Sequence, residues 1–265
     1  MELRLLQIDT FTDVVLGGNP AAVCPLDTWL DESTMQAIAA ENNLSETAFF
    51  MPEGEGFNLR WFTPNVEVDL CGHATLAAAY VVFEELRPDA QRVDFATKSG
   101  RLTVVREGAD LVMDFPAQPA APVEPPELLL GALGEPPIEV LAGADYVAVF
   151  ENATAVARLR PDLGMLMQLD RRGVVATAPG GDADDGADYV LRFFAPKNAV
   201  PEDPVSGNVQ TALVPYWSHK LGKPRMTVRQ LSARGGAMVC EDHGERISIA
   251  GRAVRYMDAR ISVAT

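Results

Sequence analysis

Cysteines, basic residues and long apolar runs are all scarce in this sequence, and each scarcity excludes a class of protein. The three cysteines, Cys24, Cys71 and Cys240, are too few and too widely spaced for a disulfide framework or a CxxC zinc site. The 22 basic residues face 37 acidic ones, and the net charge of -15 argues against a nucleic-acid partner. No stretch approaches the roughly 18 consecutive apolar residues of a membrane helix, and residues 1–7 do not resemble a signal peptide. We therefore expect a cytoplasmic protein with no membrane partner.

Motifs that bind common cofactors and metals are also missing. The sequence contains neither a Walker A run nor a GxGxxG loop placed after a strand, and none of its few lysines has a recognisable pyridoxal context. The acidic loop at 180–186 superficially resembles a calcium loop, but it lacks the acidic closing ligand of an EF-hand. We therefore predict no cofactor and no metal ligands.

The composition predicts a globular protein with a substantial core, because 48% of the residues are apolar and 22% are charged. A length of 265 residues permits two modest domains or one large one. A proline-rich segment at 116–126 separates two halves in which short β-like runs outnumber helical ones. The main helices are expected at 31–42, 72–86 and 207–221. Pro215 lies inside the last helix, which we expect to kink or stop there.

The second half of the sequence repeats the first in residues as well as in pattern. The run RWFTPN at 60–65 matches RFFAPK at 192–197, and an acidic loop, a small-residue turn and an apolar helix follow each run. The two turns are CGH at 71–73 and SGN at 206–208. We infer two similar lobes, 1–117 and 118–265, and leave open whether the last strand crosses back to the first lobe.

The helix expected to begin near Gly72 carries a thiol and an imidazole beside its first turn, from Cys71 and His73. A helix N-terminus presents unpaired N–H groups and a partial positive charge, so it can hold an anion. Two similar lobes that face each other would bring two such termini to one cleft. That cleft would clamp a carboxylate and stabilise an enolate formed next to it.

Four stretches of the chain, in order, resemble a known family. They are DTF at 9–11 with GNPAAV at 18–23, NLSETAF at 43–49, CGHAT at 71–75 and EDPVSGN at 202–208. Together they resemble the PhzF-like phenazine-biosynthesis proteins, which have the diaminopimelate epimerase-like fold. The resemblance implies an α/β (α+β) fold of two pseudo-symmetric lobes, each a curved, mostly antiparallel sheet around a central helix, with the active site between them. It also implies cofactor-independent proton transfer next to a carboxylate, and a homodimer.

The resemblance assigns catalytic roles to three residues. Glu46 matches the family's acid/base residue and Asp203 its second carboxylate, which places the substrate or shuttles the proton. His73 is close enough to the expected anion site to bind substrate or relay a proton. The residues expected to contact the substrate are Asn19, Gly72, Ser206, Gly207 and Asn208.

Two positions depart from related patterns. Diaminopimelate epimerase uses one cysteine from each lobe, but here Ser206 stands at the position equivalent to Cys71, so a two-thiol mechanism lacks its partner. We therefore interpret Cys71 as a packing residue. Many PhzF-like sequences carry serine where this chain has Asn208, which cannot act as a hydroxyl shuttle, so we expect substrate contacts to differ.

We predict a cofactor-independent isomerase or epimerase of a small anionic, carboxylate-bearing metabolite, with Glu46 as the principal acid/base. Two alternatives remain open. The same cleft would suit a non-catalytic protein that binds a small carboxylate, an option that Asn208 keeps open. An amino-acid racemase that depends on Cys71 is the other alternative.

Overall fold

The computed structural model describes residues 1–198 and 200–263. The chain divides into two compact units, Met1–Asp114 with Ala250–Thr265, and Phe115–Ile249. We call them the first and second lobe. The predicted boundary at 117/118 lies three residues from this division, and the last long strand belongs to the first lobe. No helix among the described residues is both long and apolar enough to cross a membrane.

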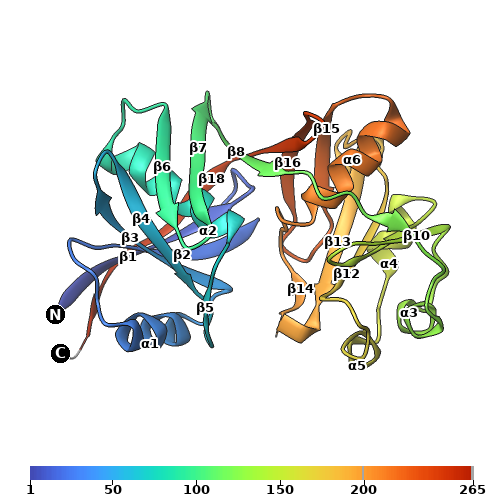
Figure 1. The fold of residues 1–265 in the computed structure, drawn as a ribbon, viewed down its shortest axis with the longest axis horizontal. Helices are drawn as coiled ribbons and strands as arrows, with labels where there is room; N and C mark the ends of the chain where they lie inside the picture. Colours follow the sequence, from blue (N-terminus) through green and yellow to red (C-terminus); the bar gives the residue numbers. More distant parts are fainter. Residues whose placement is uncertain (199, 264–265) are drawn as a thin grey trace. The chain divides into compact units, whose positions relative to one another are not determined.

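The first lobe is a mainly antiparallel sheet with two helices (Figure 1). The helices are α1 (Glu32–Asn42) and α2 (Gly72–Val81), and a π-helical segment, Val82–Leu86, continues α2. The strands are β1 (Glu2–Thr10), β2 (Asn19–Pro25), β3 (Glu46–Glu53), β4 (Gly56–Phe62), β5 (Glu67–Val68), β6 (Arg92–Thr97), β7 (Gly100–Glu107), β8 (Asp110–Pro116) and β18 (Ala253–Ser262).

Helix α2 is the central element of the first lobe. Apart from Gly72 and Tyr80 all of its residues are buried, as its almost wholly apolar sequence predicts. It packs against β1, β2, β3 and β18. A separate cluster joins α1 to the sheet, and in it Met35 and Ile38 pack with Phe49 and Phe62. The first lobe therefore fixes the N-terminus of α2 in a rigid, apolar setting.

The second lobe contains the remaining elements (Figure 1). Its helices are α3 (Glu127–Leu133), α4 (Ala153–Arg158), α5 (Leu163–Leu166) and α6 (Gln210–Leu221). Its strands are β9 (Ala121–Pro122), β10 (Glu139–Ala142), β11 (Tyr146–Val149), β12 (Val174–Pro179), β13 (Tyr189–Ala195), β14 (Val200–Asp203), β15 (Arg225–Gln230), β16 (Gly236–Asp242) and β17 (Arg246–Gly251).

Helix α6 is the counterpart of α2. Its Trp217 stacks on Tyr189 of β13 with ring centroids 5.5 Å apart, and the Trp217 Nε1 donates to the Thr177 hydroxyl of β12 at 3.0 Å. The Tyr189 hydroxyl in turn donates to Gln210 Oε1, at the first residue of α6, over 2.6 Å. Another apolar cluster joins α3, α4 and α5 to the strands β10 to β13. The buried indole and phenol both have partners, so aromatic packing here costs no unsatisfied polar group.

The pairing of strands confirms the internal repeat. In the first lobe β1–β2 is antiparallel, β2–β3 parallel, β3–β4 and β4–β5 antiparallel, β4–β6 parallel and β6–β7 antiparallel. The second lobe has the same series in β10–β11, β11–β12, β12–β13, β13–β14, β13–β15 and β15–β16. The matched arginines also agree, because Arg60 binds Glu67 through two hydrogen bonds and Arg192 binds Glu202 in the same way.

The registers also show which residue of the second lobe stands in place of Glu46. Thr47 lies opposite Phe62, and Val174 lies opposite Phe194. Because these phenylalanines are equivalent in the repeat, Glu46 corresponds to Gly173. A Cβ at Gly173 would lie 2.7 Å from both the Phe194 carbonyl oxygen and the Phe193 ring, so the second lobe excludes a side chain there.

We expected α6 either to kink or to stop at Pro215. It does not stop there, because the helix runs on to Leu221. Proline leaves the carbonyl of the residue four positions earlier without its helical donor. That carbonyl belongs to Thr211, and the backbone N–H of Gln118 donates to it at 2.9 Å. The chain segment before β9 therefore satisfies the group that Pro215 cannot.

Candidate functional site

Glu46 is placed by the parallel pairing of two strands. It is the first residue of β3 and lies in register with Ala21 of β2. Its neighbour Thr47 is buried, and the Thr47 hydroxyl accepts a hydrogen bond from the Asn42 amide at the end of α1 over 3.1 Å. The Glu46 side chain is 19% exposed, and its Oε2 atom is buried.

His73 lies beside Glu46 at the start of α2. Its side chain is 10% exposed, and its Nε2 lies 3.2 Å from Glu46 Oε2. The other ring nitrogen, Nδ1, lies 3.5 Å from the Sγ of Cys71, the residue that precedes the helix. One imidazole therefore contacts a carboxyl group and a thiol through its two nitrogens. The sequence placed His73 and Cys71 together, but it gave no sign that Glu46 would join them.

Burial determines the charge of this imidazole. It lowers the pKa of His73 from 6.5 to about 4. At neutral pH the imidazole is therefore neutral, with one nitrogen a donor and the other an acceptor. A neutral imidazole can hold or pass a proton without adding a fixed positive charge next to Glu46.

The depressed pKa of His73 predicts a pH-dependent stability. Between pH 6.5 and about 4 the unfolded chain binds a proton at His73 that the folded chain does not, so the free energy of unfolding falls as the pH falls. The stability is fully present above pH 6.5, and the loss reaches about 3 kcal/mol at pH 4. Urea unfolding of His73→Asn should show a loss between neutral pH and pH 4 that is smaller than the wild-type loss by this amount. The exposed His243 provides the control, since His243→Asn should retain the wild-type dependence; equal slopes for all three proteins would contradict the prediction.

Asn19 and Gly72 also lie in the first lobe. Asn19 is fully buried at the start of β2, and its carbonyl accepts a hydrogen bond from the Thr10 hydroxyl at 2.9 Å. The preceding Gly18 has a φ of +60°, and a Cβ there would lie 2.0 Å from the Thr10 carbonyl oxygen, so only glycine fits this turn. Gly72 is the first residue of α2, where the backbone N–H groups lack intrahelical acceptors.

A buried carboxyl group beside this turn received no role from the sequence. Asp9 is fully buried, and its Oδ2 accepts a hydrogen bond from the Leu16 N–H at 2.8 Å. It therefore holds the loop that leads into Gly18 and Asn19. Asp9 belongs to the DTF motif at 9–11, so its place in a recurring motif was the signal available.

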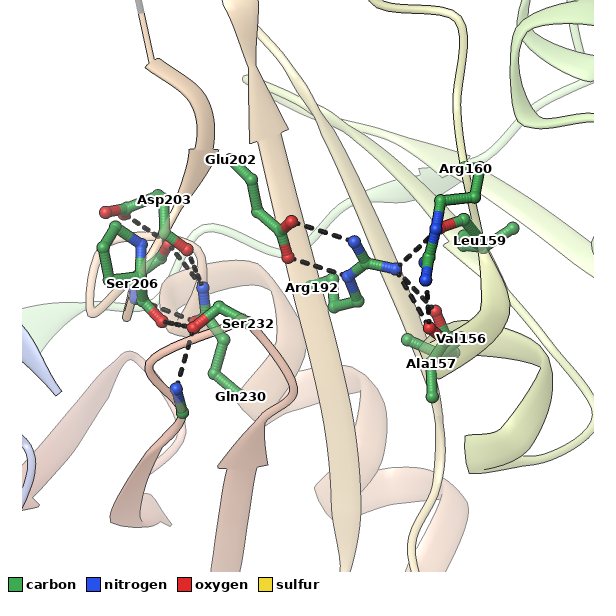
Figure 2. A network of polar contacts seen from close by, with 12 residues as sticks. Val156, Ala157, Leu159, Arg160, Arg192, Glu202, Asp203, Ser206, Gln230 and Ser232 are labelled. Atoms are coloured by element: carbon green, nitrogen blue, oxygen red, sulfur yellow. Dashed lines mark hydrogen bonds and ion pairs between the residues drawn. The ribbon is translucent and has the colours of Figure 1, made fainter. Parts of the chain in front are cut away.

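Asp203 and Ser206 come together in the second lobe, as Figure 2 shows. The Ser206 hydroxyl donates to Asp203 Oδ2 at 2.5 Å. Gln230, at the end of β15, braces the same loop, since its Nε2 donates to the Asp203 carbonyl at 2.7 Å and its Oε1 accepts from the Ser206 N–H at 2.8 Å. Sequence reasoning missed Gln230, because a lone glutamine at the end of a strand carries no motif.

Asn208 is exposed, and the structure gives it a partner that the sequence did not indicate. With its amide oxygen turned toward Arg172, that oxygen accepts from Nη1 at 2.7 Å and from Nη2 at 2.9 Å. Arg172 also forms an ion pair with the buried Asp145, and this contact raises the arginine's pKa. Gly207 is buried just before α6. The Asn208 amide therefore belongs to an ionic network, and no motif in the sequence pointed to Arg172.

These residues form two groups of polar side chains, each at the start of the central helix of its lobe. Glu46 and His73 carry the acid/base groups of the first lobe, and Asp203, Ser206 and Asn208 lie in the second. The roles assigned to them by resemblance stay predictions. Each lobe repeats the same strand pairing around a central helix.

The family model for the PhzC-PhzF family, described as phenazine biosynthesis-like protein, matches residues 8–259. The chain belongs to this family. An uncharacterized isomerase of Pseudomonas aeruginosa is 49% identical, over 98% of this chain and 99% of the relative. The crystal structure of a PhzF-family protein of Enterococcus faecalis has a TM-score of 0.96 and 39% identity, and covers 99% of this chain and 100% of that chain.

A more distant structure shows how widely the fold is used. The hydroxyproline epimerase of Agrobacterium vitis, solved with trans-4-hydroxy-L-proline, has a TM-score of 0.63 at 13% identity and covers 98% of this chain and 92% of its own. At this identity the likeness concerns the fold alone. The solved structures confirm the predicted fold class, and the close relatives named as isomerases confirm the isomerase class.

Proposed function

We propose that the protein isomerises or epimerises a small carboxylate-bearing metabolite by proton transfer through Glu46, without a cofactor. The observation that carries this proposal is the placement of the Glu46 carboxyl group, which belongs to a largely buried side chain at the first residue of β3 and lies 3.2 Å from a neutral imidazole. A carboxylate in such a place can take a proton from carbon, provided that the resulting negative charge is stabilised.

The proposed step moves one proton and one electron pair. The Glu46 carboxylate removes a proton from the carbon next to the substrate carboxylate, and the C–H electron pair becomes an enolate. The N–H groups at the start of α2, around Gly72, hydrogen-bond the substrate anion. Glu46 then returns the proton to another carbon on the same face, or, for epimerisation, keeps it while a second acid protonates the opposite face, so no oxidant or reductant is needed. His73 orients the substrate or passes the proton through its neutral ring.

We further propose that the second lobe completes the site, in a cleft shared by the two lobes. The repeat supports this view, because the two equivalent loops carry different polar groups: Cys71 and His73 in one, Ser206 and Asn208 in the other. Asp203, held by Ser206 and Gln230, would place the substrate or accept the shuttled proton. The N–H groups of Gly207 and Asn208 would add to the anion contacts. Asn19 would contact the substrate from the first lobe.

Solvent deuterium exchange tests the proposal. The purified protein is incubated in D2O with a panel of small amino and hydroxy acids, and deuterium in the recovered acids is measured by mass spectrometry. At least one acid should gain one deuterium at the carbon next to its carboxylate. If no acid exchanges with the wild-type protein, the proposed activity is wrong.

Asp203→Asn tests whether the second lobe takes part. The amide keeps the shape of the side chain but removes its charge and its ability to carry a proton, so exchange should fall by roughly 10- to 100-fold. Asp242→Asn, on β16 of the same lobe, is the matched control and should leave exchange unchanged. A rate for Asp203→Asn equal to that of the wild type would remove Asp203 from the proposed mechanism.

The sequence also left open a non-catalytic protein that binds a small carboxylate, and the isomerase class of the relatives argues against it. This candidate predicts that a carboxylate raises the melting temperature of the wild type and of Glu46→Gln equally, with no exchange in either. A Cys71-dependent racemase is less well supported, because the position equivalent to Cys71 holds Ser206, which donates to Asp203. Thiol alkylation that abolishes exchange, with protection by substrate, would favour it. The homodimer and the cytoplasmic location stay predictions.

A further inference from the structure

Three side chains of the first lobe bring different donor atoms to one point. Glu46 offers a carboxylate oxygen, Cys71 a sulfur and His73 a ring nitrogen, and these atoms all lie within 4.8 Å of one another. Cys71 and His73 are buried, and Glu46 is partly buried. The proposed proton transfer uses Glu46 and His73 but leaves the Cys71 thiol without a chemical role.

The His73 imidazole gives a second reason to expect a ligand. Its side chain is nine-tenths buried, with 10% exposed. Its Nε2 makes no hydrogen bond of good geometry with any described residue, although Glu46 Oε2 lies 3.2 Å away. A buried polar atom in this condition usually has a partner that binds it.

We propose that Glu46, Cys71 and His73 form a binding site for a thiophilic divalent cation such as Zn²⁺, and that the bound ion inhibits the enzyme. In a tetrahedral site with bonds of about 2.0–2.3 Å, neighbouring ligand atoms lie roughly 3.3–3.8 Å apart. The distance of 3.2 Å between His73 Nε2 and Glu46 Oε2 is close to the lower end of this range. The longest distance between two of the three donor atoms must shorten by about 1 Å to reach this range. Small side-chain rotations are enough for that change.

The donor set selects the kind of ion. Thiolate and imidazole ligands favour Zn²⁺ and its softer relatives, whereas Mg²⁺ and Ca²⁺ need several oxygen ligands. Glu46 is the only member of the three that offers oxygen. Three protein ligands leave a fourth position open, as in catalytic zinc sites, but here the ion occupies the Glu46 lone pair that would accept the substrate proton. The proposal that the site binds zinc is independent of the proposed function. The proposal that zinc inhibits the enzyme rests on the proposed function.

Metal binding is measured first, without turnover. The full-length protein is dialysed against ZnCl₂, with MgCl₂ in a parallel sample, and the retained metal is measured by elemental analysis. We expect the wild type to retain a stoichiometric zinc ion and no magnesium. With Co²⁺ as a spectroscopic probe, the absorption band of a cobalt–thiolate bond should appear.

Matched variants locate the site. Cys71→Ser and His73→Asn should lose the stoichiometric ion, and Cys71→Ser should also lose the cobalt–thiolate band. Cys240→Ala and His243→Asn, which change the same residue types in the second lobe, should keep both. Circular dichroism confirms that each variant is folded, and the cobalt spectrum of the wild type tests thiolate ligation even if a variant does not fold.

Two results would overturn the site: no zinc retained by the wild type, or zinc retained unchanged by Cys71→Ser. Solvent exchange, measured with and without ZnCl₂, then tests inhibition separately. Exchange by the wild type should be lost on adding zinc and return on adding a chelator, and Cys71→Ser should resist. Zinc that binds without changing the exchange rate would leave the site but refute inhibition, and an absence of exchange in every sample would refute the proposed function without affecting the binding result.

Discussion

Replacing Glu46 with glutamine should reduce solvent deuterium exchange by about 10²- to 10⁴-fold, the usual range for loss of a general acid/base. Glutamine retains the size and hydrogen-bonding shape of the side chain but cannot accept the carbon-bound proton. Because Glu46 is partly exposed and heads a strand whose pairing uses only its backbone, the variant should fold with unchanged stability. Deuterium incorporation and thermal unfolding, measured on the same preparations, check both statements.

Glu53 provides the matched control for Glu46. It lies at the other end of β3, is exposed, and is seven residues away on the same strand. Glu53→Gln should exchange at the wild-type rate, since its carboxyl group faces solvent near Asn58. Equal, measurable rates for Glu46→Gln and the wild type would remove Glu46 from the mechanism and leave the Cys71-dependent racemase as the better interpretation.

Replacing Arg192 with methionine should cost about 3 kcal/mol of unfolding free energy, the lower end of the range for breaking a buried ion pair. The Arg192 side chain is 9% exposed and binds Glu202 through two hydrogen bonds. Its Nη1 also donates to three carbonyls near the end of α4, those of Val156, Ala157 and Leu159, as Figure 2 shows. The lower end applies because Glu202 is 25% exposed and regains part of its hydration.

Urea unfolding measures the loss of unfolding free energy in Arg192→Met. The comparison is a variant of an Arg–Glu ion pair at the surface. Arg225 and Glu241 form an ion pair with side chains 62% and 31% exposed, so Arg225→Met should cost no more than about 1 kcal/mol. A similar cost for both variants would mean that burial adds nothing to the Arg192–Glu202 pair. Because Glu202 precedes Asp203, loss of Arg192 should also slow exchange beyond any loss of stability.

The sequence predicted the fold more completely than the site. The repeat of RWFTPN and RFFAPK located equivalent strands, and the structure places Arg60 and Arg192 in equivalent ion pairs. Local sequence could not show that Pro215 would be accommodated, because the compensating donor, Gln118, is far away in the chain. Helix α4 was missed because it is only six residues long, although Asn152 caps it through a hydrogen bond to the Ala155 N–H.

Within the site, resemblance supplied the residues and the fold supplied their neighbours. Glu46 and His73 are 27 positions apart, and no periodicity in the sequence requires their contact. It arises because β3 pairs in parallel with β2 while α2 packs on both strands. Gln230 and Arg172 escaped notice for the same reason, since each acts through a contact made by tertiary folding.

The glycine at 173 has a consequence for how this enzyme tolerates mutation. In a protein with an internal duplication, an equivalent residue in the second copy could take over the role of a lost residue. Here that is prevented, because a Cβ at Gly173 would collide with the Phe194 backbone. The second lobe therefore cannot acquire a glutamate at the place equivalent to Glu46 without rebuilding β13. The proposed acid/base function has no spare copy, so a lineage that loses Glu46 must regain it at that codon or abandon this chemistry.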